Sequence, residues 1–171
     1  TLNKPADGYT ILDAWVSPLS TVPIIRDVKY DSHKDFIPLW GVVKNPNIVV
    51  IRRSETRFTT MKELIKFAQE HPGIKYSTGP ANSINHFTIA LMLRKLDVKV
   101  RNVPYPGGAA SVKDLIGKVL DFSIVNPGVC KMHNSDHNPI AALTDERPVL
   151  LPDVPAVKEL GYWSPGPYGY V

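Results

Sequence analysis

The residues best suited to chemistry lie in two loops of the same kind, each between a short apolar strand and a helix. The first loop covers 78–83, after a strand at 75–77, and the second covers 104–108, after a strand at 98–103. A helix that begins after such a loop has backbone N–H groups without an intrahelical acceptor, and its dipole favours negative charge there. Two such helix starts in one small sheet predict a pocket for a small anion such as a carboxylate.

Gly107 and Gly108 stand directly before the second helix. Glycine lets the backbone approach a ligand closely because no side chain covers the amides, although the same pair would also suit a tight turn with no binding role. The sequence contains neither the Gly-x-x-x-x-Gly-Lys-Ser/Thr loop nor the Gly-x-Gly-x-x-Gly fingerprint. A small anion is therefore favoured over a nucleotide.

Ser83 and His86 admit three interpretations. Ser83, or Asn82 beside it, is suited to cap the helix that follows, which is compatible with a ligand contact nearby. His86, one turn into that helix, could donate to a carboxylate or be hydrogen-bonded inside its own lobe. A hydrolase would need an acid to orient His86 and a nucleophile elbow around Ser83, and neither is present. We expect no catalytic residues and no enzyme.

His133 and His137 have the spacing of two metal ligands on one helix face. The intervening residues 134–136 are poor helix formers and Pro139 follows, so we interpret this segment as a solvated turn. The single cysteine, Cys130, is expected to be a small buried apolar residue. We therefore expect no metal site and no cofactor.

Apolar patterning predicts the elements that position these loops. A capping box, Thr60 with Glu63, predicts the start of one helix, and a continuous β-branched run at 48–51 predicts a strand covered on both faces. Strands alternating with short helices predict an α/β fold with a mostly parallel sheet, whose ligands lie beyond the carboxyl ends of the strands. Besides the strands already named, we predict strands at 9–12, 122–125 and 140–143, a possible strand at the end of the tail, and helices at 61–68, 84–96, 110–117 and 154–160.

Composition excludes several classes of protein. The chain has 171 residues, 43% of them apolar, and a formal net charge of +4, but its basic residues do not cluster into the stripe that nucleic-acid binding requires. No run reaches the roughly 18 apolar residues of a membrane span, so we expect no direct membrane insertion. No signal peptide is present at Thr1, and we expect either that it was cleaved or that the chain is an internal fragment.

Six stretches together resemble one family, and they occur in its order at close to its spacing. They are 5–12, 30–38, 76–79 leading to Ser83 and His86, 103–109, 114–117 with Asp121, and 151–155. On these motifs the chain resembles the extracytoplasmic solute receptors of tripartite tricarboxylate transporters, the Bug family. The resemblance implies a periplasmic location and a type II periplasmic-binding-protein-like fold, with one complete lobe plus part of the other. By this likeness 1–47 are part of the first lobe, 48–163 the second lobe, and 164–171 a hinge segment that returns towards the first.

The resemblance also implies a ligand and a partner. The ligand is a small organic carboxylate, held by loop amides and hydroxyls, and the partner comprises the membrane subunits of a tripartite tricarboxylate-type transporter. The residues that match the family's ligand loops are Asp13, Ala14, Trp15, Ser77, Thr78, Gly79, Asn82, Ser83, His86, Tyr105, Gly107, Gly108 and Ala109. Asp13 departs from the family's pattern, and its charge would repel a carboxylate unless the ligand also carries an amine.

The sequence thus predicts a non-enzymatic receptor that captures a small organic acid for a transporter. An alternative in a different class is a ligand-sensing, effector-binding domain of a signalling protein with the same fold. A hydrolase that uses Ser83 and His86 is the third alternative.

Overall fold

The computed structural model describes residues 3–14, 16–81, 83–164 and 168–170. The chain divides into two compact units. Unit 1 comprises Thr1–Asn45 with Tyr168–Val171, and unit 2 comprises Pro46–Pro167. Unit 2 contains both glycine-bearing loops, and each unit is described by itself below.

The described residues of unit 1 form one helical segment and one pair of strands. The π-helix η1 (Ser17–Thr21) continues directly into α1 (Val22–Ile25), and Pro18 is tolerated in the first turn because no hydrogen bond is needed there. Strand β1 (Val43–Asn45) pairs antiparallel with β7 (Tyr168–Tyr170), so the strand predicted near the end of the tail is confirmed.

The strand predicted at 9–12 is wrong. None of these residues is in a strand, and the side chains of Tyr9 and Ile11 are 92% and 76% exposed. A strand needs a hydrogen-bonded partner, and in the described part of unit 1 the only paired strands are β1 and β7. The local β-branched and aromatic composition is therefore not sufficient to form a strand here.

Unit 2 is built on a five-stranded sheet in the order β4-β3-β5-β2-β6. Strands β3 (Lys75–Ser77), β4 (Arg101–Asn102) and β5 (Phe122–Val125) are parallel to one another. Strand β2 (Ile48–Arg52) is antiparallel to β5 and also to β6 (His137–Ala142), so β6 has the direction of β5. The register of β2 on β6 shifts between Val49 and Val50, beside Pro139. The predicted α/β class is confirmed, but the sheet is mixed, because β2 runs antiparallel to both of its neighbours.

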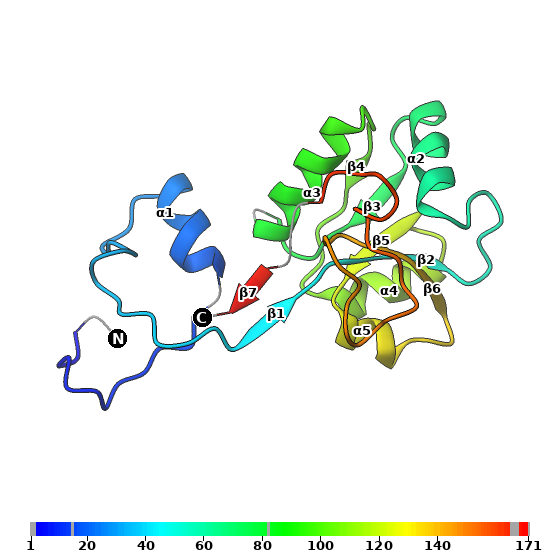
Figure 1. Cartoon of the computed structure of the whole chain (residues 1–171). Helices are drawn as coiled ribbons and strands as arrows, with labels where there is room; N and C mark the ends of the chain where they lie inside the picture. Colours follow the sequence, from blue (N-terminus) through cyan, green and yellow to red (C-terminus); the bar gives the residue numbers. More distant parts are fainter. Residues whose placement is uncertain (1–2, 15, 82, 165–167, 171) are drawn as a thin grey trace. The chain divides into compact units, whose positions relative to one another are not determined.

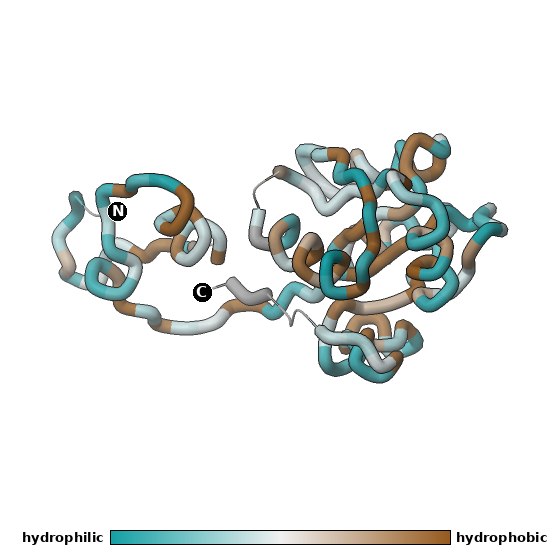
Figure 2. The backbone as a smooth tube through the Cα atoms, turned by 90° about the horizontal axis from the view of Figure 1, so that it is seen from above, coloured by the Kyte–Doolittle hydropathy of each residue, from teal (hydrophilic) through white to brown (hydrophobic). Residues whose placement is uncertain are grey.

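Helices cover both faces of this sheet (Figure 1). Helices α2 (Met61–Glu70) and α3 (Ile84–Lys95) pack on one face, and α4 (Gly108–Ile116) and α5 (Pro127–Met132) pack on the other. Alternate residues of each strand point to opposite faces, so Val49 and Ile51 join the first core cluster while Ile48 and Val50 join the second. Figure 2 shows hydrophobic residues along the central strands and hydrophilic residues in the surrounding loops of unit 2.

Helix α2 begins as its sequence predicts. The hydroxyl of Thr60 accepts a hydrogen bond from the Glu63 amide at 3.2 Å, and the Glu63 carboxylate accepts one from the Thr60 amide at 3.2 Å. This reciprocal capping satisfies two N–H groups that the helix itself leaves without acceptors. The buried face of the helix then carries Met61, Leu64, Ile65 and Ala68.

The helix predicted at 154–160 is wrong. Ala142, at the end of β6, donates to the carbonyl of Pro155 and accepts from the amide of Val157, both at 2.8 Å, which forms a parallel bridge to Ala156. These bonds hold 155–157 extended, and only a single turn follows before Gly161. The carbonyl of Pro155 and the amide of Val157 are therefore bonded to Ala142 and not to groups within a helix.

In the described part of the chain, no helix has the length and apolar character needed to cross a membrane.

Candidate functional site

The two glycine-bearing loops lie side by side at the carboxyl edge of the sheet. Parallel strands β3 and β4 end there as neighbours, and the Val103 amide donates to the carbonyl of Tyr76 at 2.8 Å. Beyond the strands, the Tyr105 amide donates to the carbonyl of Gly79 at 3.1 Å and so joins the two loops directly. This adjacency is what the sequence predicts, while the role of the loops in ligand binding stays a prediction.

The first loop leaves β3 through Ser77, Thr78 and Gly79, all of them buried. The Ser77 hydroxyl accepts a hydrogen bond from the Gly79 amide at 3.3 Å. Gly79 has a φ of +88°, a conformation that L side chains rarely adopt, so glycine is required by the backbone itself. The Thr78 side-chain oxygen is buried and has no hydrogen-bond partner among the described residues. Asn82, also predicted for this loop, lies outside the described residues.

Ser83 caps helix α3. Its hydroxyl oxygen accepts from the amide of His86 at 3.2 Å, so the described contact between these two residues involves the main chain of His86. The His86 ring lies next to the ring of Phe87, with 5.7 Å between centroids. The capping interpretation of Ser83 is confirmed. The amides of the first two residues of α3 do not donate to this cap.

Helix α4 starts differently, because Gly107 stands at its N-cap and no side-chain cap is described for it. The amides of the first three residues, Gly108 to Ala110, therefore have no intrahelical acceptor. A β-carbon added at Gly108 would lie 3.4 Å from methyl groups of Val125 and Val129, so this helix start packs closely on the end of β5. Ala109 is exposed.

Tyr105 anchors the second loop at two points. Besides the bond from its amide to Gly79, its hydroxyl donates to the carboxylate of Asp114 on α4. Partial burial, the hydrogen bond and the nearby negative charge raise the pKa of Tyr105 to about 12, so the hydroxyl keeps its proton at neutral pH. Sequence reasoning missed Asp114 as this partner, because the two residues meet only after the loop folds back onto the helix.

Three of the predicted site residues, Asp13, Ala14 and Trp15, belong to unit 1. Asp13 is exposed and Ala14 is buried. Trp15 lies outside the described residues. A role of these three residues in ligand binding stays a prediction.

The segment with two histidines is only partly the solvated turn that we predict. Residues 134–136 are exposed, but His137 is the first residue of β6 and is fully buried, with its Nε2 3.3 Å from the Sγ of Cys130. Burial lowers the pKa of His137 and raises the pKa of the Cys130 thiol to about 11. The described residues contain no group of three or more His, Cys, Asp and Glu residues that could hold a metal ion.

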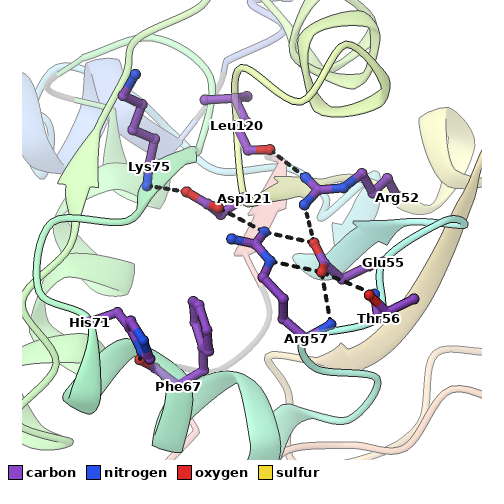
Figure 3. A network of polar contacts seen from close by, with 9 residues as sticks. All are labelled: Arg52, Glu55, Thr56, Arg57, Phe67, His71, Lys75, Leu120 and Asp121. Atoms are coloured by element: carbon purple, nitrogen blue, oxygen red, sulfur yellow. Dashed lines mark hydrogen bonds and ion pairs between the residues drawn. The ribbon is translucent and has the colours of Figure 1, made fainter.

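A second polar cluster lies at the opposite edge of the sheet (Figure 3). The Glu55 carboxylate binds the guanidinium groups of both Arg52 and Arg57, and Arg57 also pairs with Asp121 at 2.8 Å. Asp121 in turn accepts from the Lys75 amide at 2.8 Å. Two cations and two anions thus satisfy one another at the starts of β3 and β5, which indicates a stabilising network.

Burial by itself would raise the pKa of Glu55. Hydrogen bonds from Arg57, together with the charges of Arg52 and Arg57, outweigh this effect and lower the pKa of Glu55 to about 2. The carboxylate therefore stays charged throughout the neutral and mildly acidic range.

Solved structures share this fold. A protein of R. palustris solved with adipate superposes with a TM-score of 0.82 at 24% identity, covering 99% of this chain and 58% of that protein. MatC from Rhodopseudomonas palustris, solved with bound malate, gives a TM-score of 0.70 at 19% identity over 85% of this chain and 51% of MatC. The predicted α/β, periplasmic-binding-protein-like fold class is confirmed.

Sequence comparison identifies the family. Protein BugT of Bordetella pertussis is 26% identical over 167 residues, which are 95% of this chain and 51% of BugT, so the chain spans about half the length of such relatives. The sequence profile described as tripartite tricarboxylate transporter family receptor matches residues 2–171. Members of that family are periplasmic solute-binding receptors rather than enzymes. The chain therefore belongs to the tripartite tricarboxylate transporter receptor family.

Proposed function

We propose that this chain is part of a periplasmic receptor that binds a small organic carboxylate and delivers it to the membrane subunits of a tripartite tricarboxylate-type transporter. The observation that carries this proposal is the hydrogen bond from Tyr105 to Gly79, which joins the two glycine-bearing loops at one edge of the sheet. Two helices, α3 and α4, begin directly after these loops.

The chemistry of the edge suits a carboxylate. The uncapped amides at the start of α4 are hydrogen-bond donors, and the positive end of the helix dipole favours an anion beside them. Thr78 adds a buried hydroxyl without a partner among the described residues, which a ligand oxygen would satisfy. Hydrogen bonds to a charged acceptor are roughly twice as strong as neutral ones, so a few such donors give useful affinity.

Relatives support the class of ligand. Two of the solved structures with this fold contain adipate and malate, and both of these ligands are dicarboxylates. Within this chain we assign ligand contacts to Ser77, Thr78, Gly79, Asn82, Ser83, His86, Tyr105, Gly107, Gly108 and Ala109, with Asp13, Ala14 and Trp15 contributing from the first lobe. In this proposal the lobes are 1–47 and 48–163, and 164–171 is the return hinge segment.

Calorimetric titration of the natural full-length protein with acetate, malate, adipate and citrate tests the proposal. We expect saturable binding of at least one of these acids. In Gly108→Val the added methyl groups would press on Val125 and Val129 and move the helix start, so we expect at least a tenfold loss of affinity. Gly108→Ala is the matched control, because its β-carbon fits at 3.4 Å and its affinity should stay close to that of the wild type.

Two results would contradict the proposal. One is the absence of heat and of any thermal stabilisation with all four acids. The other is an unchanged affinity in a Gly108→Val variant that folds normally, because the amides of α4 would then have no part in binding.

A further inference from the structure

Two buried serines lie beneath the start of α4. Ser111 is in the first turns of this helix and Ser123 is in the middle of β5, and both are fully buried. The Ser111 hydroxyl donates to the carbonyl of Gly108 at 2.8 Å, and the two hydroxyl oxygens are 2.8 Å apart. Each hydroxyl has one proton, and the proton of Ser111 is used on Gly108. The Ser123 hydroxyl is therefore the donor in the bond between the two serines.

Ser123 is a rigid point of attachment. It pairs in register with Ser77 on β3 and with Val50 on β2, so its strand is held from both sides in the middle of the sheet. The chain of bonds from Ser123 through Ser111 to Gly108 thus connects the sheet to the first peptide group of α4. In the described structure, no side chain caps the N-terminus of α4.

The hydrogen bond from Ser111 to the Gly108 carbonyl also bears on the direction of a backbone donor, the N–H of Ala109. The carbonyl of Gly108 and the amide of Ala109 belong to the same planar, trans peptide group, so they point in opposite directions. Within the helix this carbonyl accepts from the Val112 amide, and the Ser111 hydroxyl, itself bonded to Ser123, adds a second bond that ties the direction of the Ala109 N–H to the sheet. That N–H is one of the amides that α4 leaves without an intrahelical acceptor.

We propose that Ser111 and Ser123 are positioning residues for the ligand site, which hold the peptide between Gly108 and Ala109 so that its N–H faces the ligand carboxylate. This inference rests on the proposed function, and it adds two residues that do not themselves touch the ligand.

The single and double alanine variants separate positioning from stability. Ser111→Ala leaves the Ser123 hydroxyl buried without its acceptor, so this variant should lose thermal stability. The double variant Ser111→Ala/Ser123→Ala replaces both hydroxyls by apolar groups and should recover most of that stability. We expect its affinity for adipate to remain about tenfold below wild type, because the start of α4 is no longer tied to β5 by the bond between the two serines. Thr60→Ala, which removes the cap of α2 and lies outside the two glycine-bearing loops, is the control that lowers stability without lowering affinity.

A second readout does not depend on the ligand. In the ligand-free protein, the backbone order parameter of the Ala109 N–H should fall from the rigid value of about 0.85 towards 0.6 in Ser123→Ala and in the double variant. An unchanged order parameter, or an affinity that recovers together with stability in the double variant, would overturn the inference. If wild type binds no carboxylate while the order parameter falls as expected, the proposed function fails although the serine pair still orders the helix start.

Discussion

The substitution Glu55→Gln tests the polar cluster at the amino edge of the sheet. It keeps the shape of the side chain and removes its charge, while Arg52 and Arg57 keep theirs. The side chains of Glu55 and Arg52 are only 2% and 9% exposed, so water cannot replace the lost partner. Glu55 also accepts bonds from the amides of Thr56 and Arg57, both at 3.0 Å, and the new amide group cannot satisfy all of these donors.

Two estimates of the cost agree. Removing one partner of a buried ion pair typically costs about 3–5 kcal/mol. Independently, a pKa that falls from its ordinary value of 4.5 to about 2 corresponds to about 3 kcal/mol of folding free energy. We therefore expect Glu55→Gln to lower the free energy of unfolding by about 3 kcal/mol at pH 7.

Urea unfolding of both proteins between pH 7 and pH 2 measures this difference. Because the pKa of Glu55 is lowered in the folded state, its contribution is complete above pH 4.5 and is lost as the pH falls towards 2. The two unfolding curves should therefore converge at the acid end. Glu70→Gln is the control, because its pair with Lys66 is exposed and 3.9 Å long and should contribute less than about 1 kcal/mol. A loss below about 1 kcal/mol for Glu55→Gln at pH 7, or a difference that persists at pH 2, would refute this reasoning.

Three further predictions concern single contacts. Thr60→Ala should lower the free energy of unfolding by about 1 kcal/mol in urea, because α2 loses its cap, and an unchanged midpoint would contradict this. Tyr105→Phe should cost about 1 kcal/mol, because Asp114 loses a donor, whereas Tyr9→Phe on an exposed side chain should cost nothing measurable. Burial lowers the pKa of His137, so wild type should lose stability as the pH falls below about 6.5, and this slope should be absent in His137→Gln.

Local signals were sufficient where neighbours in sequence decide the structure. The β-branched run at 48–51 forms the buried strand that it predicts, and the capping box of Thr60 and Glu63 starts a helix as expected. The two loops could likewise be located from their glycines, because φ at Gly79 disfavours any L side chain and Gly108 has room for no more than a β-carbon beside Val125 and Val129.

Contacts between distant segments decided the rest. Residues 9–12 have strand composition but no partner strand in the described structure, and 154–160 have a helical pattern that pairing with Ala142 overrides. His137 is buried against Cys130 because α5 and β6 pack together, which a polar turn sequence does not indicate. The Ser111–Ser123 pair depends in the same way on how α4 lies on β5.

The two outer strands of the unit 2 sheet have a consequence for how this protein behaves when concentrated. Strand β4 is only two residues long, and β6 carries Pro139 beside a register irregularity. A short outer strand offers little backbone for another molecule to extend, and proline has no N–H to donate to an incoming chain. Both borders of the sheet are thus poor templates for strand addition, which protects the folded unit against edge-to-edge aggregation.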